Sequence, residues 1–110
     1  MNLEQIAQNY FKTFENKDLE KLGDMFSDNV ELKDWNIFAS SKDSVLEANK
    51  EIFNSVEKLK IVISNLYVSG MTAIGELLIY ADDGDVLPVV DVIQFDDDFK
   101  IKSIVAYRGN

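Results

Sequence analysis

Apolar residues recur at helical spacing in the first half of the chain. Near the amino terminus this spacing predicts a helix over about residues 3–16, with Asn2 placed to cap its first free amide groups. Asp18 precedes a second, shorter helical run that ends near residues 27–29. A third helix, capped by a serine or aspartate within residues 41–44, is predicted to bury a stripe made of Val45, Ala48, Ile52, Phe53 and Val56.

The second half of the chain changes to a period of two, which is typical of strands. One strand is already predicted at residues 30–34, and four more are predicted at about 59–68, 71–81, 86–95 and 100–107. The acidic segments 82–85 and 96–98 are interpreted as hairpin turns rather than calcium loops. Pro88 predicts a bulge or an entry to an edge position, because proline cannot donate to the ladder. Grouped helices followed by antiparallel hairpins predict one α+β domain over residues 1–110, with helices packed on a curved, mostly antiparallel sheet.

Composition narrows the classes of function. The 20 acidic against 11 basic residues give a net charge of −9, which disfavours nucleic acid and anionic membranes as partners. The chain has no cysteine and no histidine, so acid–base chemistry has to use Asp, Glu, Tyr or Lys, and no thiolate metal site can form. No leader and no stretch of about 20 apolar residues is found, and a cytoplasmic location is expected.

Three polar side chains stand where apolar residues are expected. Tyr10 lies on the apolar stripe of the first helix, Asp34 keeps the parity of the strand at residues 30–34, and Asp91 shares a strand face with apolar neighbours. Each has an ordinary interpretation: a core tyrosine, a turn-forming aspartate, and an aspartate in a local hydrogen bond or dimer contact. Together they indicate a site, because an unpaired buried carboxylate is costly unless it is protonated or reached by a ligand.

The sequence also resembles a known family. The likeness covers nearly the whole chain and rests on residues 10–19, 25–34, 90–95 and 104–109. These segments resemble the SnoaL-like and ketosteroid-isomerase-like members of the nuclear-transport-factor-2-like superfamily. The resemblance implies a cone-shaped, cystatin-like roll. It also implies that Asp34 shuttles a proton while Tyr10 and a protonated Asp91 stabilise an enolate oxygen.

Two functions are expected from these observations. The first is a cofactor-independent acid–base enzyme, an isomerase or aldol-type cyclase, acting on a small apolar carbonyl compound without a metal. Phe14, Trp35 and Phe53 are the predicted apolar walls of its pocket, and Trp35 stands where steroid isomerases have proline. The alternative is a non-catalytic module of the same fold that binds an apolar ligand or only dimerises. A homodimer is expected in either case, because an apolar outer sheet face invites association.

Overall fold

The structure, a computed structural model, describes residues 2–82, 84 and 86–109. The helices lie in the first half of the chain and most strands follow them, as the sequence predicted. Three helices are found in this part of the chain, and they are α1 (Leu3–Glu15), α2 (Leu19–Met25) and α3 (Lys42–Ser55). The strands are β1 (Phe26–Lys33), β2 (Phe38–Ser40), β3 (Leu59–Ser69), β4 (Thr72–Ala81), β5 (Val86–Phe95) and β6 (Ile101–Arg108).

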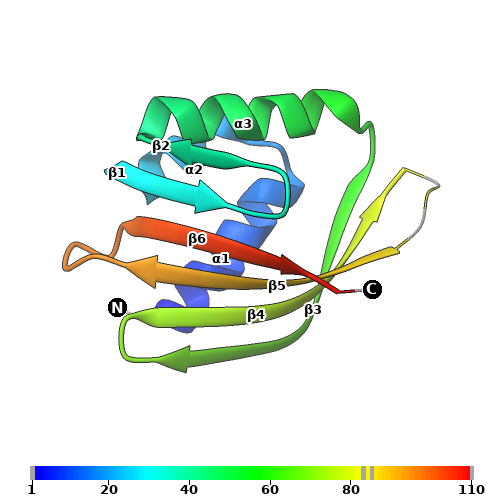
Figure 1. Ribbon diagram of the computed structural model, residues 1–110. Helices are drawn as coiled ribbons and strands as arrows, with labels where there is room; N and C mark the ends of the chain where they lie inside the picture. Colours follow the sequence, from blue (N-terminus) through cyan, green and yellow to red (C-terminus); the bar gives the residue numbers. More distant parts are fainter. Residues whose placement is uncertain (1, 83, 85, 110) are drawn as a thin grey trace.

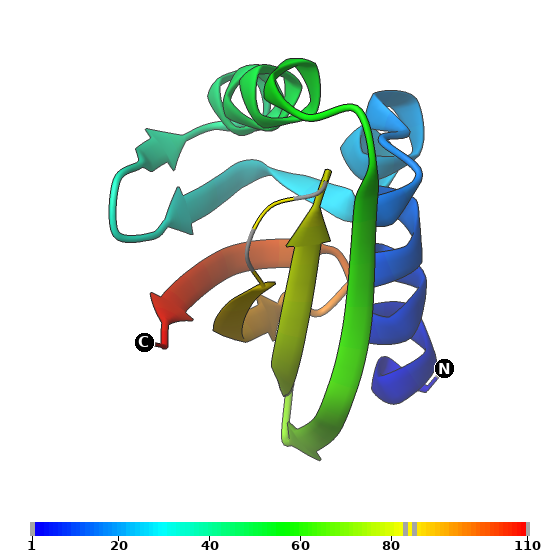
Figure 2. The same ribbon diagram turned by 90° about the vertical axis from the view of Figure 1, so that its right-hand side faces the viewer.

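All of these strands form one mixed sheet. Its order is β2-β1-β6-β5-β4-β3, and the β1–β6 pair is parallel whereas the other pairs are antiparallel. The sheet is curved and does not close on itself, as Figures 1 and 2 show from two directions. Helix α1 packs against β3 and β4, and α3 packs against β1 and β2. The predicted α+β fold, with helices on a curved and mostly antiparallel sheet, is therefore confirmed.

Each helix begins at a polar cap that the sequence predicted. The Asn2 side chain accepts hydrogen bonds from the amides of Glu4 and Gln5, at 2.9 and 3.4 Å. Asp18 caps α2 and Ser41 caps α3 in the same way. These oxygens satisfy amide groups that have no partner inside the helix, which fixes where each helix starts.

The region around β1 and β2 differs from the prediction. Strand β1 begins at Phe26, before the predicted start at residue 30, and its pairing with β6 shifts register between Phe26 and Glu31. This irregularity hid the first half of the strand, because the polar residues of the shifted segment break the period of two. Strand β2 was not predicted, since its three residues are too few to show any period. Of the acidic turn predicted at residues 82–85, Asp83 and Asp85 lie outside the described residues.

Pro88 lies in a regular part of the sheet, so the predicted bulge is wrong there. It pairs with Leu78 of β4 without a register shift. On its other side the Pro88 carbonyl accepts a hydrogen bond from the Gly109 amide at 2.8 Å, just past the end of β6. The Pro88 nitrogen, which carries no hydrogen, points to the same side as the Pro88 carbonyl, because N and O of one strand residue point to the same side. On that side β6 has just ended. Pro88 therefore lies where β5 loses its neighbour β6, which agrees with the predicted entry to an edge position.

The concave face of the sheet holds the core. Its largest fully buried side chains come from α2, α3 and the three strands β1, β5 and β6, and they are Phe26, Phe95, Leu22, Ile93, Ile101, Ile104, Val30 and Val45. Gly75 of β4 lets α1 come close to the sheet, since a Cβ there would lie 2.8 Å from Cζ of Phe11. None of the described helices has the length and apolar character needed to cross a membrane.

Candidate functional site

A cavity of about 300 Å³ lies between the helices and the concave face of the sheet. It is found where α3 passes into β3 and where β4 and β5 meet, the end of the molecule that faces the viewer in Figure 2. Apolar side chains make most of its wall: Phe14, Leu32, Trp35, Ile37, Ile52, Val56, Leu59, Ile61, Ile79, Ala81, Leu87, Val89, Ile104 and Ala106. The volume is at the lower end of the range for small-molecule sites.

All three polar residues singled out in the sequence line this one cavity. Tyr10 enters from α1, Asp91 from the middle of β5, and Asp34 from the residue that follows β1. Asp91 pairs with Gly75 in the neighbouring strand. The close approach of α1 at Gly75 therefore brings the helix that carries Tyr10 next to the strand that carries Asp91.

The cavity shifts the acidity of two of these groups. Burial raises the pKa of the Asp91 carboxyl to about 7, and the nearby charge of Asp34 adds to the rise. Burial also raises the pKa of the Tyr10 hydroxyl well above its usual value of 10.0, with a further contribution from the negative charge of Asp91. Both effects disfavour the charged form in an apolar wall. Tyr10 is therefore a hydrogen-bond donor at neutral pH, and Asp91 is mostly protonated, and so a donor as well, only below about pH 7.

Neither donor is used inside the part of the protein that the structure describes. Tyr10 is 4% exposed, yet its hydroxyl forms no hydrogen bond with Asp91 or with the backbone there, and Asp91 also has no such partner. A purely structural role for the two residues predicts that they are bonded to each other or to the backbone. Both groups line the cavity and are available to donate a hydrogen bond to a molecule inside it.

Asp34 has a structural role in addition to its place in the cavity. One oxygen, Oδ1, accepts hydrogen bonds from the amides of Asn36 and Ile37, at 2.7 and 2.6 Å. These bonds form an Asx turn that leads into β2, so the turn interpretation of this residue is correct. The turn also fixes the orientation of the carboxylate, and its second oxygen is not engaged in the turn.

The structure places two of the three predicted aromatic wall residues at the cavity. Phe14 and Trp35 line the cavity, whereas Phe53 does not. Phe53 is buried behind Phe14, with the two rings edge to face and their centroids 4.8 Å apart. Phe53 lies on the face of α3 that packs into the core, and it supports the cavity wall from behind instead of forming part of it. Trp35 is at the rim, 40% exposed, and the guanidinium carbon of Arg108 lies 6.0 Å from the centre of its ring.

One polar residue of the site was missed by the sequence interpretation. Asn49 of α3 lines the cavity and is 2% exposed. Its side-chain nitrogen has no hydrogen-bond partner among the described residues. The signal was present in the spacing, because Asn49 lies four residues after Val45 and four before Phe53, on the same buried stripe.

Comparisons with known proteins agree with this architecture. The profile of the SnoaL-like domain family matches residues 7–104. No curated protein sequence matches the chain significantly. Among solved structures, a candidate isomerase of the SnoaL-like family from Agrobacterium tumefaciens superposes with a TM-score of 0.86 at 16% identity, with 100% of each chain covered.

Two further structures have the same fold. A candidate ketosteroid isomerase from Kribbella flavida gives a TM-score of 0.86 at 14% identity, covering 98% of this chain and 78% of that one. An NTF2-like protein of unknown function from Cytophaga hutchinsonii gives 0.83 at 9% identity, covering 99% and 91%. At these identities the likeness shows the fold alone. Because the family profile spans nearly the whole chain and the fold agrees with it, the protein belongs to the SnoaL-like domain family.

Proposed function

We propose that the protein is a cofactor-independent acid–base enzyme that moves a proton at a carbon next to a carbonyl group. Its substrate is a small, mostly apolar ketone, and the reaction is an isomerisation or an aldol-type cyclisation. The observation that carries the proposal is the pair of free donors, Tyr10 and Asp91, in an apolar cavity that also contains the carboxylate of Asp34. Candidate isomerases are found among the proteins that share the fold.

The proposed step uses each group for one task. The Asp34 carboxylate takes a proton from the carbon next to the carbonyl, the electron pair of the broken C–H bond forms a carbon–carbon double bond, and the π pair of the carbonyl moves to its oxygen. Tyr10 and protonated Asp91 donate hydrogen bonds to the resulting enolate oxygen, which stabilises the charge that develops there. With a β,γ-unsaturated ketone, return of the proton from Asp34 to the far end of the conjugated enolate completes an isomerisation. In a cyclisation the enolate carbon attacks a second carbonyl group, and the alkoxide formed there takes the proton from Asp34.

The test is deuterium uptake by 2-tetralone, a bicyclic ketone with acidic protons next to its carbonyl, followed by NMR in heavy water. We expect exchange above the buffer rate with the parent protein. Asp34→Asn is expected to lower this exchange by roughly 10²–10⁴-fold, because an amide cannot act as the base. The variant retains the Oδ1 acceptor of the Asx turn, so the local fold is preserved.

Asp97→Asn in the exposed turn between β5 and β6 is the matched control, and it is expected to exchange at the parent rate. A parent protein that gives no exchange with 2-tetralone or other β,γ-unsaturated and cyclic ketones would contradict catalysis on this substrate class. Equal rates in the parent and Asp34→Asn would contradict the role given to Asp34.

One observation favours a second candidate function, the binding of an apolar ligand without turnover. An oxygen of Asp34 is occupied by the Asx turn, which gives this residue a structural reason to be present. The cavity wall is otherwise apolar, which suits a ligand captured by burial of its surface. This candidate predicts saturable binding of 2-tetralone with no deuterium uptake.

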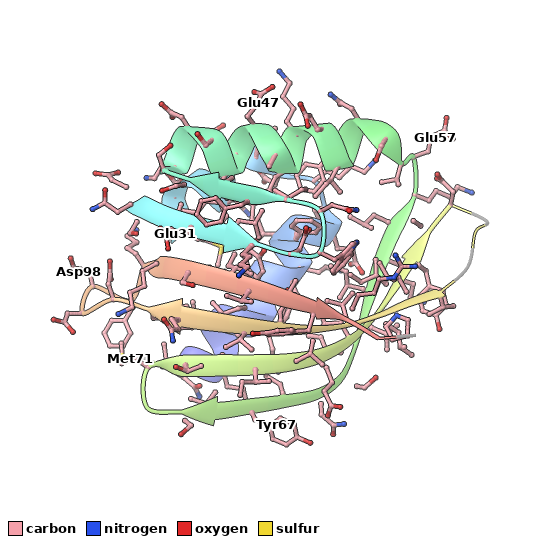
Figure 3. The ribbon with its side chains drawn as sticks, viewed as in Figure 1. Glu31, Glu47, Glu57, Tyr67, Met71 and Asp98 are labelled. Atoms are coloured by element: carbon pink, nitrogen blue, oxygen red, sulfur yellow. The ribbon has the colours of Figure 1, made fainter. Side chains whose placement is uncertain are left out.

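A homodimer formed through the outer face of the sheet is also proposed. Exposed apolar side chains on this face support it: Val62, Tyr67, Tyr80, Val86 and Tyr107. Tyr67 lies on the outermost strand β3, where Figure 3 labels it. Sedimentation velocity at micromolar concentration should give a dimer, and Tyr107→Glu should shift it to the monomer. A monomeric parent would contradict this proposal.

A further inference from the structure

The buried stripe of α3 contains one polar residue. Val45, Asn49 and Phe53 are spaced four apart and therefore share the face that packs toward the sheet. Glu47 lies on the opposite face and points away from the sheet in Figure 3. Asn49 is as deeply buried as its apolar neighbours, with 2% of its surface exposed, and it lines the cavity that contains Tyr10, Asp34 and Asp91.

The fold itself gives no reason for an amide at this position. A primary amide offers two donors and an acceptor oxygen, and its nitrogen in Asn49 has no partner in the described part of the chain. Burying an amide without a hydrogen bond destabilises the folded state, whereas leucine has a similar shape and no polar group to satisfy. Asn49 is therefore explained by something that enters the cavity rather than by packing.

Asn49 reaches the cavity from a different element than the two free donors. Tyr10 and Asp91 come from α1 and β5, while Asn49 comes from α3, which packs over β1. We propose that the Asn49 amide binds a second oxygen function of the ligand, so that the ligand has two oxygen functions joined by an apolar skeleton, as in a hydroxyketone or diketone. The proposal rests on the proposed function for the placement of the first oxygen, at Tyr10 and Asp91.

The size of the cavity limits the length of that skeleton. Its volume of about 300 Å³ corresponds to roughly ten water molecules at 30 Å³ each. A compact one- or two-ring compound with an oxygen at each end fits this description. Asn49 would then be a specificity-determining residue, since a site built to bond an oxygen discriminates against an analogue that lacks it.

The test compares two rigid ligands that differ in one hydroxyl group, 2-naphthol and 2,6-dihydroxynaphthalene, by calorimetric titration. The shared phenolic oxygen imitates an enolate oxygen, and the second hydroxyl can serve either the nitrogen or the oxygen of the Asn49 amide. We expect the parent protein to bind the diol about 3–10-fold more tightly than 2-naphthol, the gain of one net hydrogen bond.

Asn49→Leu is expected to abolish this gain while it leaves the affinity for 2-naphthol unchanged or improved. Asn54→Leu, an exposed asparagine on the same helix, is the matched control and should keep the gain. As a second measurement, Asn49→Leu without ligand should unfold at a temperature about 4–8 °C higher than the parent, because an unsatisfied amide has been removed.

Several results would overturn the proposal. They are equal affinity of the parent for the two naphthols, an undiminished gain in Asn49→Leu, no binding of either naphthol, or a lower unfolding temperature of Asn49→Leu, which would show that the amide is bonded within the fold. Absence of deuterium uptake by 2-tetralone would instead contradict the proposed catalysis and would leave the naphthol comparison unaffected. Failure of the two proposals is therefore distinguishable.

Discussion

Alternate side chains at both ends of strand β5 point to the same face of the sheet, and yet their surroundings differ. At one end Ile93 and Phe95 are fully buried in the core between the helices and the sheet. At the other end Leu87, Val89 and Asp91 line the cavity. All five of these residues belong to one series of alternate positions that face the helices. What differs is whether side chains from the helices fill the space above the strand.

This difference separates residues that hold the fold together from residues that are available for a ligand. The packed end contains large apolar side chains in mutual contact. The hollow end carries Tyr10, Asp91 and Asn49, whose polar groups have no partner among the residues that the structure describes and whose burial costs stability. A protein under selection for stability alone would fill this end with leucine or phenylalanine.

The largest expected effect is a loss of stability at the packed end. Ile93→Ala removes a fully buried side chain and should lower the free energy of unfolding by about 2–5 kcal/mol. Leu87→Ala, on the same face of β5, only enlarges an existing cavity and should cost roughly 1 kcal/mol. Urea unfolding of both variants measures the contrast. Equal losses would mean that the hollow end is collapsed in solution and that the comparison fails.

The next effect is a dependence of stability on pH that arises at the hollow end. The folded protein holds the proton of Asp91 up to about pH 7, whereas the unfolded chain releases it near the ordinary value of 3.8. Between these values the folded state binds more protons, so the contribution of Asp91 to stability falls as the pH rises. Above pH 7 its charged form should destabilise the fold by about 4 kcal/mol.

Asp91→Asn isolates this contribution, because the neutral amide does not titrate. The difference in unfolding free energy between variant and parent should be small at pH 4 and should grow in favour of the variant up to about pH 7. Urea unfolding at a series of pH values measures it. A difference that does not change with pH would show that Asp91 keeps an ordinary pKa and that the cavity is filled with water.

The comparison also explains which features the sequence could predict. Tyr10, Asp34 and Asp91 were identified because each interrupts an apolar period, and period is the property that sequence reveals best. Asn49 interrupts the α3 stripe in the same way but was passed over, because the stripe was assigned to neighbouring residues such as Ala48 and Ile52. The position of Phe53 behind Phe14 could not be predicted. Periodicity indicates that a side chain faces inward, but it does not indicate which side chains it contacts.

A smaller effect is expected at the junction of the two ends, where α1 approaches the sheet. Gly75→Ala would place a Cβ 2.8 Å from Phe11, in a contact that only movement of the ring or of α1 can relieve. We expect a loss of about 1–3 kcal/mol in unfolding free energy. The same movement displaces Tyr10, so the affinity for 2-naphthol should also fall.

Gly23→Ala in α2 is the control for this substitution. Its added Cβ would make an ordinary contact, 3.4 Å from Cδ1 of Leu46, and alanine is the better helix former. The variant should match the parent or gain up to about 1 kcal/mol in thermal unfolding. If both alanine variants behaved alike, the close approach at Gly75 would not be what positions α1.

The smallest effect is expected at the rim of the hollow end, where Arg108 lies over the ring of Trp35. An exposed contact of this kind contributes about 0.5–1 kcal/mol, so Arg108→Gln should barely change the unfolding temperature. It should still free the indole, and because Trp35 is the single tryptophan of the chain, its fluorescence reports on this place alone. Acrylamide should quench Arg108→Gln more strongly than the parent, and Arg108→Lys should lie between them because it keeps a cation near the ring. Quenching that is equal in all three proteins would mean that Trp35 is held by the cavity wall, and that the hollow end is closed by packing and not by charge.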